Sequence, residues 1–288
     1  MTVAQSEDRW AAWLRGRRDG GSERERRALL ERLAPVRDRV LDGAAVEPGD
    51  VVLDVGCGDG LIGLGALDRG ASVIFSDISQ DCLDDCRAAA GTKARYVVAD
   101  ATALGDVEAD VVTARSVLIY VADKARAFAE FFRVLRPEGR LSLFEPVNRF
   151  GAAERRLTLG GFDVLGIEEL VARIVAETER ADQAGGGLGP MLDFDEYDLF
   201  RAAEAVGFET VRLETVVELT PEPMFLTRDW ETMLRMSPNP ISPTLGEAIE
   251  RSLSPAEADR VAAVLRPQVE AGRGTSRFAV AYLVARKP

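Results

Sequence analysis

The sequence predicts a doubly wound α/β fold, in which seven mostly parallel strands form one sheet with helices on both faces. Three observations support this prediction. Short apolar runs alternate with helical patterns from residue 51 onward, the first run ends in a glycine-rich loop, and the alternation is interrupted at residues 151–195 and 222–275. Alternation of this kind is typical of parallel sheets, because each crossover between parallel strands needs its own connecting helix.

Composition limits the class of protein. The chain has 288 residues, of which 47% are hydrophobic, so it can bury a substantial core. Its formal net charge of −12 argues against a nucleic-acid partner, because such binding depends on Lys and Arg at phosphates. The longest apolar run, residues 278–285, is far shorter than the roughly 18 residues of a membrane span. The first residues lack the pattern of a secretory signal, so we expect a cytoplasmic protein without a membrane partner.

The counts of histidine and cysteine exclude several kinds of site. The sequence has no histidine, which rules out a Ser-His-Asp triad and the commonest zinc and iron sites, and we expect no metal. Three cysteines suit a reducing compartment. Cys82 and Cys86 are four residues apart on one predicted helix, as a thiolate pair or two packing residues would be, and Cys57 reads as a small loop residue.

The first half of the chain predicts five strands and their helices. Residues 1–46 are expected to be helical, with Ser22 and Glu25 forming a capping box. Residues 136–139 (Arg-Pro-Glu-Gly) predict a turn before the fifth strand. The expected strands are 51–55, 72–76, 95–99, 110–114 and 140–144, and the expected helices are 61–69, a segment from Ser79 to about Gly91, and a segment capped by Asp123 that buries Phe128 and Phe131.

The second half predicts two helical insertions around the last core elements. The first insertion should hold a helix at Ile167–Ile174 and a break at 185–190, and the second a helix around Trp230 and another that opens at Ser254. Trp230, Met224, Phe225 and Met233 would line an apolar pocket or form the insertion's own core. We expect the insertions to fold over the carboxyl edge of the sheet as a lid. The expected divisions are 1–46 (helical segment), 47–150 (core), 151–195 (insertion), 196–221 (core helix and strand), 222–275 (insertion) and 276–288 (final core strand).

The segment that carries most information about function is a strand followed by alternate glycines, Val51-Val52-Leu53-Asp54-Val55-Gly56-Cys57-Gly58-Asp59-Gly60. Glycine is needed where the backbone turns sharply beside a ligand, and the helix that follows offers free N–H groups. Residues 58–63 also satisfy the dinucleotide pattern G-x-G-x-x-G, and Asp77 follows Gly58 at the distance expected of a ribose-binding acid. The loop alone therefore leaves two adenosine cofactors open.

Three further features bear on that choice. Asp54 is an acid inside an apolar strand, and burying a carboxylate is costly unless it has polar partners. Asp100 ends the third predicted strand, where its carboxylate can accept a hydrogen bond from an adenine amino group. The Arg-Pro-Glu-Gly-Arg stretch at 136–140 enters the fifth strand.

Taken in order, these motifs resemble the class I S-adenosylmethionine-dependent methyltransferases, in particular the branch typified by ubiquinone-biosynthesis enzymes, and the core is also similar to that of arsenite methyltransferases. The resemblance covers residues 47–146 well and residues 196–219 and the last strand more loosely. It implies a Rossmann-like class I methyltransferase fold, S-adenosylmethionine as cofactor and S-adenosylhomocysteine as product. The residues that would contact or support the cofactor are Asp54, Gly56, Cys57, Gly58, Asp77, Ile78, Asp100, Ala101 and Arg115.

Candidates for chemistry lie after the fourth and fifth predicted strands. Glu145 is the leading candidate for a general base and Tyr120 the second, since no histidine is available. Asn148 and Arg149 would contact the methyl acceptor. Many methyl transfers need little beyond positioning and removal of water, so a base is not required.

Three functions remain open on the sequence. The first is transfer of a methyl group to a small-molecule acceptor on oxygen, nitrogen or carbon, favoured by a lid that encloses the site. The second is a non-catalytic S-adenosylmethionine-binding protein. The third is an NAD-dependent oxidoreductase that uses the overlapping glycine pattern, which gives no role to Asp100. The oligomeric state, monomer or homodimer, stays open.

Overall fold

The computed structural model describes residues 8–151, 158–182 and 189–288. The chain forms two compact units, and each is assembled from separate segments. The sheet unit contains residues 31–149, 190–216 and 279–288, and the insertion unit contains residues 1–30, 150–189 and 217–278.

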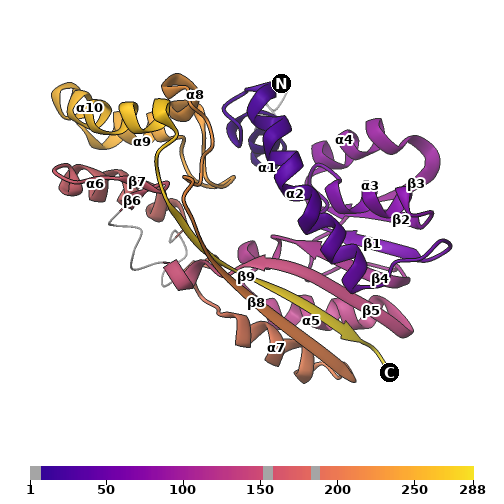
Figure 1. The fold of residues 1–288 in the computed structure, drawn as a ribbon. Helices are drawn as coiled ribbons and strands as arrows, with labels where there is room; N and C mark the ends of the chain where they lie inside the picture. Colours follow the sequence, from indigo (N-terminus) through magenta and orange to yellow (C-terminus); the bar gives the residue numbers. More distant parts are fainter. Residues whose placement is uncertain (1–7, 152–157, 183–188) are drawn as a thin grey trace, which may run out of the picture. The chain divides into compact units, whose positions relative to one another are not determined.

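The sheet has seven strands in the order β3-β2-β1-β4-β5-β9-β8 (Figure 1), which confirms the predicted fold class. The pairs from β3 to β5 are parallel, whereas β9 joins β5 antiparallel. The strands are β1 (Val51–Val55), β2 (Ser72–Asp77), β3 (Ala94–Val98), β4 (Ala109–Arg115), β5 (Leu135–Pro146), β8 (Thr210–Thr220) and β9 (Ser276–Arg286).

Helices cover both faces of this sheet (Figure 1), and each face has its own apolar cluster. On one face Val40, Leu41 and Leu83 pack against β1 and β2. On the other, Phe128, Phe131 and Leu199 pack against β4 and β5. The helices are α2 (Glu23–Gly43), α3 (Leu61–Asp68), α4 (Gln80–Ala90), α5 (Lys124–Val134) and α7 (Glu196–Ala205), with short turns η2 (Gly91–Lys93), η3 (Leu118–Tyr120) and η4 (Asn148–Gly151).

Predicted start and stop signals account for several helix ends. The Ser79 side chain accepts a hydrogen bond from the Cys82 N–H at the start of α4, and that of Asp123 accepts one from the Arg126 N–H at the start of α5. These contacts satisfy N–H groups that a helix leaves unpaired at its first turn. Only half of the predicted capping box at α2 is present, with the Glu25 N–H 3.4 Å from the Ser22 hydroxyl.

The predicted turn at residues 136–139 was wrong, because β5 continues through it. Ala109 pairs with Leu135, and after an irregularity in the register Val111 pairs with Arg140. Glu138 takes up the extra length with a left-handed φ of 62°. A β-bulge of this kind absorbs additional residues without ending the ladder, so a turn-like sequence lies within a strand.

The insertion unit contains mainly helices around a third apolar cluster. Trp230 and Met233 are buried in that cluster, Phe225 packs against it, and Met224 is exposed, so three of the four predicted pocket residues belong to the insertion's own core. Its elements are α1 (Arg9–Ala12), η1 (Trp13–Arg17), β6 (Thr158–Leu159), β7 (Phe162–Asp163), α6 (Glu168–Asp182), α8 (Trp230–Arg235), α9 (Leu245–Ser252) and α10 (Pro255–Ala271). Most of the predicted break at 185–190 lies outside the described residues.

Two elements of this unit were not predicted. The β6–β7 hairpin turns at Gly160 and Gly161, whose φ angles of 61° and 93° are the left-handed values that a two-residue hairpin needs. Helix α9 begins with a capping box between Thr244 and Glu247. Both signals are present in the sequence, as a Gly-Gly pair and as a Thr-x-x-Glu pattern.

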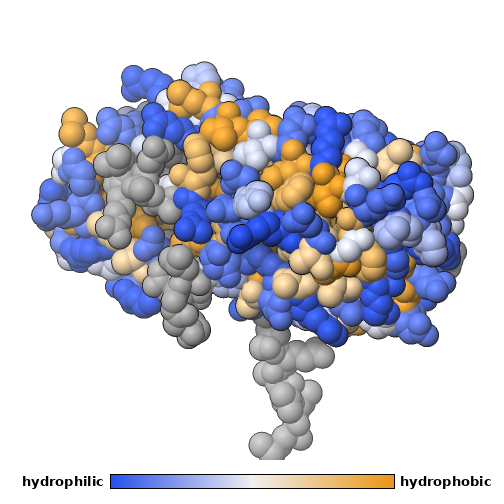
Figure 2. All heavy atoms as spheres, turned by 90° about the horizontal axis from the view of Figure 1, so that it is seen from below, coloured by the Kyte–Doolittle hydropathy of each residue, from blue (hydrophilic) through white to orange (hydrophobic). Residues whose placement is uncertain are grey.

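Among the described residues, no helix is long and apolar enough to cross a membrane. The surface combines many charges with separate apolar side chains, and Figure 2 shows orange apolar patches among hydrophilic residues on one face. Exposed large apolar side chains include Ile78, Val98, Val217 and Leu219.

Candidate functional site

The glycine loop joins β1 to α3 at the carboxyl edge of the sheet. Gly56, Gly58 and Gly60 have φ angles of 61°, 52° and 80°, which residues with a Cβ rarely adopt. Gly60 is the N-cap of α3 and has no side chain to bond the first N–H groups of the helix. The Gly63 N–H in the first turn donates to Asp54, and the absence of a side chain at Gly60 lets a polar or negative group approach the start of the helix.

Hydrogen bonds attach this loop to the end of β2. The Cys57 N–H donates to the Ser76 carbonyl at 3.0 Å, and the Gly58 N–H donates to Oδ2 of Asp77 at 2.9 Å. Oδ1 of Asp77 accepts from the Ser79 N–H at 2.9 Å. Each carboxylate oxygen has two lone pairs, so Asp77 can order the loop and still accept hydrogen bonds from a ligand.

Asp54 supports the loop from beneath. It is 2% exposed, Oδ2 accepts from the Gly63 N–H at 2.9 Å, and Oδ1 accepts from the Thr113 hydroxyl at 3.1 Å. Burial raises the pKa of Asp54 to about 7, while the two hydrogen bonds and the charge of Arg115 act in the opposite direction. One side chain thus connects β1, the first turn of α3 and β4.

The last glycine of the overlapping G-x-G-x-x-G pattern has a packing role. A Cβ at Gly63 would overlap the ring of Phe75 on β2, and the Gly63 N–H is the donor to Asp54. Close packing of helix on strand accounts for this glycine, and the same packing is expected whichever adenosine cofactor binds.

The ends of β2 and β3 present the predicted adenosine-contacting residues. Ile78 follows β2 directly and is 49% exposed, and Val98 at the end of β3 is 57% exposed. Asp100 is also exposed, and its Oδ1 accepts from both the N–H and the hydroxyl of Thr102, at 2.8 and 2.6 Å. Ala101 is buried beside it. Open apolar surface beside a hydrogen-bond acceptor suits an adenine, whose flat faces are apolar and whose edge carries an amino group.

Glu145 occupies the end of β5 and holds the loop that follows β4. It is fully buried, Oε1 accepts from the Val117 and Leu118 N–H groups at 2.9 Å each, and Oε2 accepts from Ile119 at 3.2 Å. Burial raises the pKa of Glu145 to about 7, although the three bonds favour the ionised form. Service as a general base would require the carboxylate to leave these donors, so that role stays a prediction.

The loop that Glu145 holds lies against the glycine loop. A Cβ at Gly56 would stand 2.5 Å from Cγ2 of Val117, so these two loops touch at a position where only glycine fits. Arg115 ends β4 and is half-buried, Ser116 has a left-handed φ of 56°, and Tyr120 is half-buried against the core. No pattern in the sequence directly indicated that residues 117–119 support the site.

The three cysteines are buried thiols. The Cys57 and Cys86 sulfur atoms are 3.8 Å apart, and the Cys86 thiol donates to the Gly58 carbonyl at 3.4 Å. The contact with the Cys86 thiol and burial both raise the pKa of Cys57, so Cys57 lies beneath the loop as a neutral thiol. Cys82 forms part of the first turn of α4.

The residues present fit S-adenosylmethionine on three observations of the structure. At Gly56 the glycine loop approaches Val117 so closely that no Cβ fits, and the N-cap of α3 carries no side chain. Two backbone N–H groups hold the Asp77 carboxylate, which would accept hydrogen bonds from the ribose hydroxyls.

Comparison with known proteins agrees with this description. The family model described as "Methyltransferase domain" matches residues 53–143. The ubiquinone biosynthesis O-methyltransferase of Hahella chejuensis is 34% identical over 42% of this chain and 52% of its own length. The nocamycin O-methyltransferase of Saccharothrix syringae is 33% identical over 41% of this chain and 45% of its own.

These curated relatives are therefore matched over only about half of their length. A solved structure from Bacillus halodurans, provisionally described as a methyltransferase, has the same fold with a TM-score of 0.54, 19% identity, and coverage of 88% of this chain and 98% of its own. These matches identify residues 53–143 as a methyltransferase domain, and the sheet order and the solved structure agree on the Rossmann-like fold of class I methyltransferases.

Proposed function

We propose that this protein binds S-adenosylmethionine and transfers its methyl group to a small-molecule acceptor. The observation that carries the proposal is the glycine loop held against Asp77, with the Gly58 N–H and the Ser79 N–H bonded to the two oxygens of that carboxylate. This arrangement supports the proposal, because it holds a carboxylate that can accept hydrogen bonds from a ribose beside a loop whose backbone a ligand can approach closely.

Each residue then has a definite task. When bound, the cofactor supplies an electrophilic methyl group on a sulfonium. Asp77 accepts hydrogen bonds from the ribose hydroxyls, Ile78 packs on the adenine, and Asp100 accepts from its amino group through the oxygen that Thr102 does not occupy. The backbone of residues 56–58 lies along the methionine part, and Asp54 keeps that backbone in place through α3.

A hydroxyl oxygen is the first acceptor atom to test, because two relatives are named O-methyltransferases. The net charge of −12 disfavours nucleic acid as acceptor. Glu145 and Tyr120 remain the candidates for a base. Glu145 is also engaged by three backbone N–H groups, so it would support turnover by holding the loop at residues 117–119.

Calorimetric titration of the purified protein with S-adenosylmethionine, S-adenosylhomocysteine and NAD tests the cofactor. We expect the two sulfur compounds to bind and NAD not to bind. Asp77→Ala should weaken binding by about 10- to 100-fold, the effect of losing one or two hydrogen bonds to a charged group. Asp106→Ala, which removes an exposed acid in the loop before β4, is the matched control and should bind like the wild type.

The outcomes separate the three functions. Binding of NAD alone would refute the proposal in favour of an oxidoreductase. A second assay follows transfer of a labelled methyl group to a panel of phenols and other small hydroxyl compounds. Tight cofactor binding without transfer to any small molecule would favour a binding protein that does not catalyse.

A further inference from the structure

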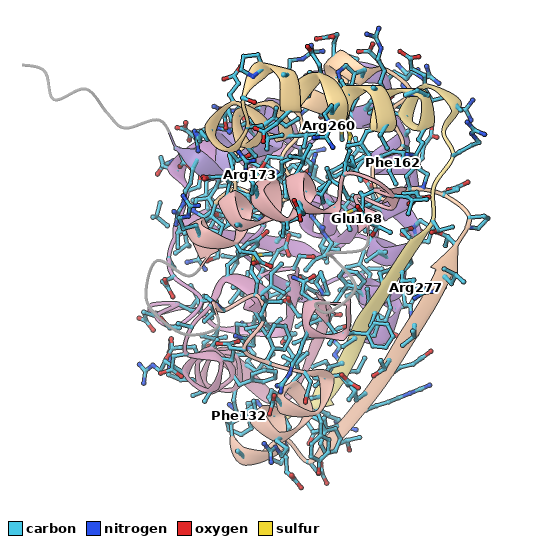
Figure 3. All side chains as sticks on the ribbon, turned by 90° about the vertical axis from the view of Figure 1, so that its left-hand side faces the viewer. Phe132, Phe162, Glu168, Arg173, Arg260 and Arg277 are labelled. Carbon is cyan, nitrogen blue, oxygen red and sulfur yellow. The ribbon has the colours of Figure 1, made fainter. Side chains whose placement is uncertain are left out.

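One edge of the sheet is formed by an unusually long open strand, β8. It has 11 residues, against a mean of roughly 5–6 for strands, and it stands last in the strand order. Figure 3 shows it at the rim of the sheet beside β9, and among the described residues no strand lies on its other side. An edge of this kind presents unpaired N–H and C=O groups that can pair with another chain.

The side chains of β8 differ along its length on one face. Val211 and Leu213 are half-buried against the cluster that includes α5 and α7. Further along the same alternation, Val217 and Leu219 are 54% and 63% exposed. One half of this face is therefore packed and the other half leaves two large apolar side chains in water.

The other face of β8 carries opposite charges at its two ends. Arg212 and Glu218 are both exposed, and they stand equally far from Thr215 at the centre of the strand. Val216 on this face packs against the cluster that includes α2. Opposite charges placed symmetrically about a central residue favour a partner strand that runs in the reverse direction.

The order of residues in β8 is self-complementary when a second copy runs antiparallel about Thr215. Arg212 then faces Glu218, and each exposed apolar residue faces an apolar residue of the other copy. In this register Val211 stands opposite Leu219, Leu213 opposite Val217, Glu214 opposite Val216, and Thr210 opposite Thr220. Directly opposed side chains lie about 4.5–5.5 Å apart, close enough for both the apolar and the ionic pairs to form.

We infer that β8 pairs with β8 of a second copy of this chain across a two-fold axis at Thr215, joining two sheets into one. Two-fold symmetry uses the same surface twice, so each pair between unlike residues forms two times. The occupant is a second copy because the apolar and charged positions match within this one sequence. Strand pairing alone buries little area, so we expect a reversible dimer whose population rises with concentration.

Sedimentation velocity over a range of protein concentration measures the association. We expect the mass to rise from 31.2 kDa toward twice that value. Leu219→Lys places a charge opposite Val211 and should weaken the dimer at least tenfold. A mass that stays at the monomer value at every concentration, or a dimer that Leu219→Lys leaves unchanged, would overturn the inference.

Cross-linking tests the register without depending on the strength of the dimer. Thr215→Cys brings two thiols together at the axis within reach of a disulfide, whose Cα atoms are usually about 4.4–6.8 Å apart. The matched control is Thr210→Cys, also exposed and also a threonine, whose two copies would be ~34 Å apart at ~3.4 Å per residue. Under mild oxidation we expect a cross-linked dimer from the first variant alone. No cross-link at Thr215, or equal cross-linking of both, would refute the register.

A charge exchange tests the ionic pairs. Glu218→Arg places an arginine opposite Arg212 at both symmetry-related pairs and should weaken the dimer about tenfold or more. The double variant Arg212→Glu with Glu218→Arg restores opposite charges and should return the dissociation constant to within about threefold of the wild type. A double variant no tighter than the single one would contradict the pairing.

Discussion

Replacement of Glu145 by glutamine tests whether this carboxylate maintains the loop after β4. The side chain keeps its size and its Oε1, which can still accept from the Val117 and Leu118 N–H groups. In place of Oε2 it presents an NH2 group to the Ile119 N–H, so one acceptor becomes a donor facing a donor.

The expected loss of stability follows from that exchange. One hydrogen bond disappears and a buried N–H is left without an acceptor, which costs about 1–3 kcal/mol. Glu145→Ala removes all three bonds and should cost more, at roughly 3–5 kcal/mol, because it also leaves a cavity in a fully buried site. Glu209→Gln, an exposed glutamate before β8, is the control and should stay within about 0.5 kcal/mol of the wild type.

Urea unfolding at pH 8 followed by far-ultraviolet circular dichroism gives the free energies of unfolding. Tryptophan fluorescence is less suitable, because Trp10, Trp13 and Trp230 all belong to the insertion unit. Hydrogen exchange adds a local measurement, and the amides of residues 117–119 should lose protection in Glu145→Gln. Stability equal to that of Glu209→Gln, with unchanged exchange at these amides, would show that the carboxylate does not hold this loop.

Two further predictions concern pH and the glycine loop. Burial raises the pKa of both Asp54 and Glu145 to about 7, above the value of about 4 in an unfolded chain, so the folded state binds more protons between these values. The free energy of unfolding should therefore fall as pH rises from about 4 to 7 and level off above that range. Glu145→Gln removes one of the two groups, so it should reduce the slope. A wild-type stability that rises with pH over this range, or a slope that Glu145→Gln leaves unchanged, would argue against the raised pKa values of Asp54 and Glu145. Gly56→Ala should cost about 1–3 kcal/mol and weaken cofactor binding, because its Cβ would meet Val117 at a left-handed φ. Adding Val117→Ala should recover part of the stability in urea unfolding, and no recovery would place the cost in backbone strain alone.

The sequence predicted the structure correctly at positions where a residue type has a single physical explanation. The glycines after β1, the capping residues Ser79 and Asp123, and the buried strand β1 all lie where their patterns predicted. Asp54 was singled out as a buried acid in need of polar partners, and its bonds to α3 and β4 supply them. Each of these signals is local, so tertiary contacts do not overrule it.

The sequence was less informative where distant segments determine the outcome. The stretch at 136–139 has the composition of a turn, yet pairing of β5 with β4 on both sides extends the strand through it. The three hydrogen bonds of Glu145 were not predicted, because they depend on how the loop at 117–119 folds back, about thirty residues earlier in the chain. No pattern within residues 117–119 or around Glu145 predicts these hydrogen bonds.

The position of β9 in the sheet bears on how the chain is made. It is the last strand in sequence, yet it lies between β5 and β8, and its hydrogen bonds to β5 run from Arg140 to Pro146. During synthesis β8 is therefore translated before β9, and β8 can join the sheet only after the final residues of the chain have been translated. A chain cut before residue 276 would therefore lack the strand that joins β8 to the rest of the sheet.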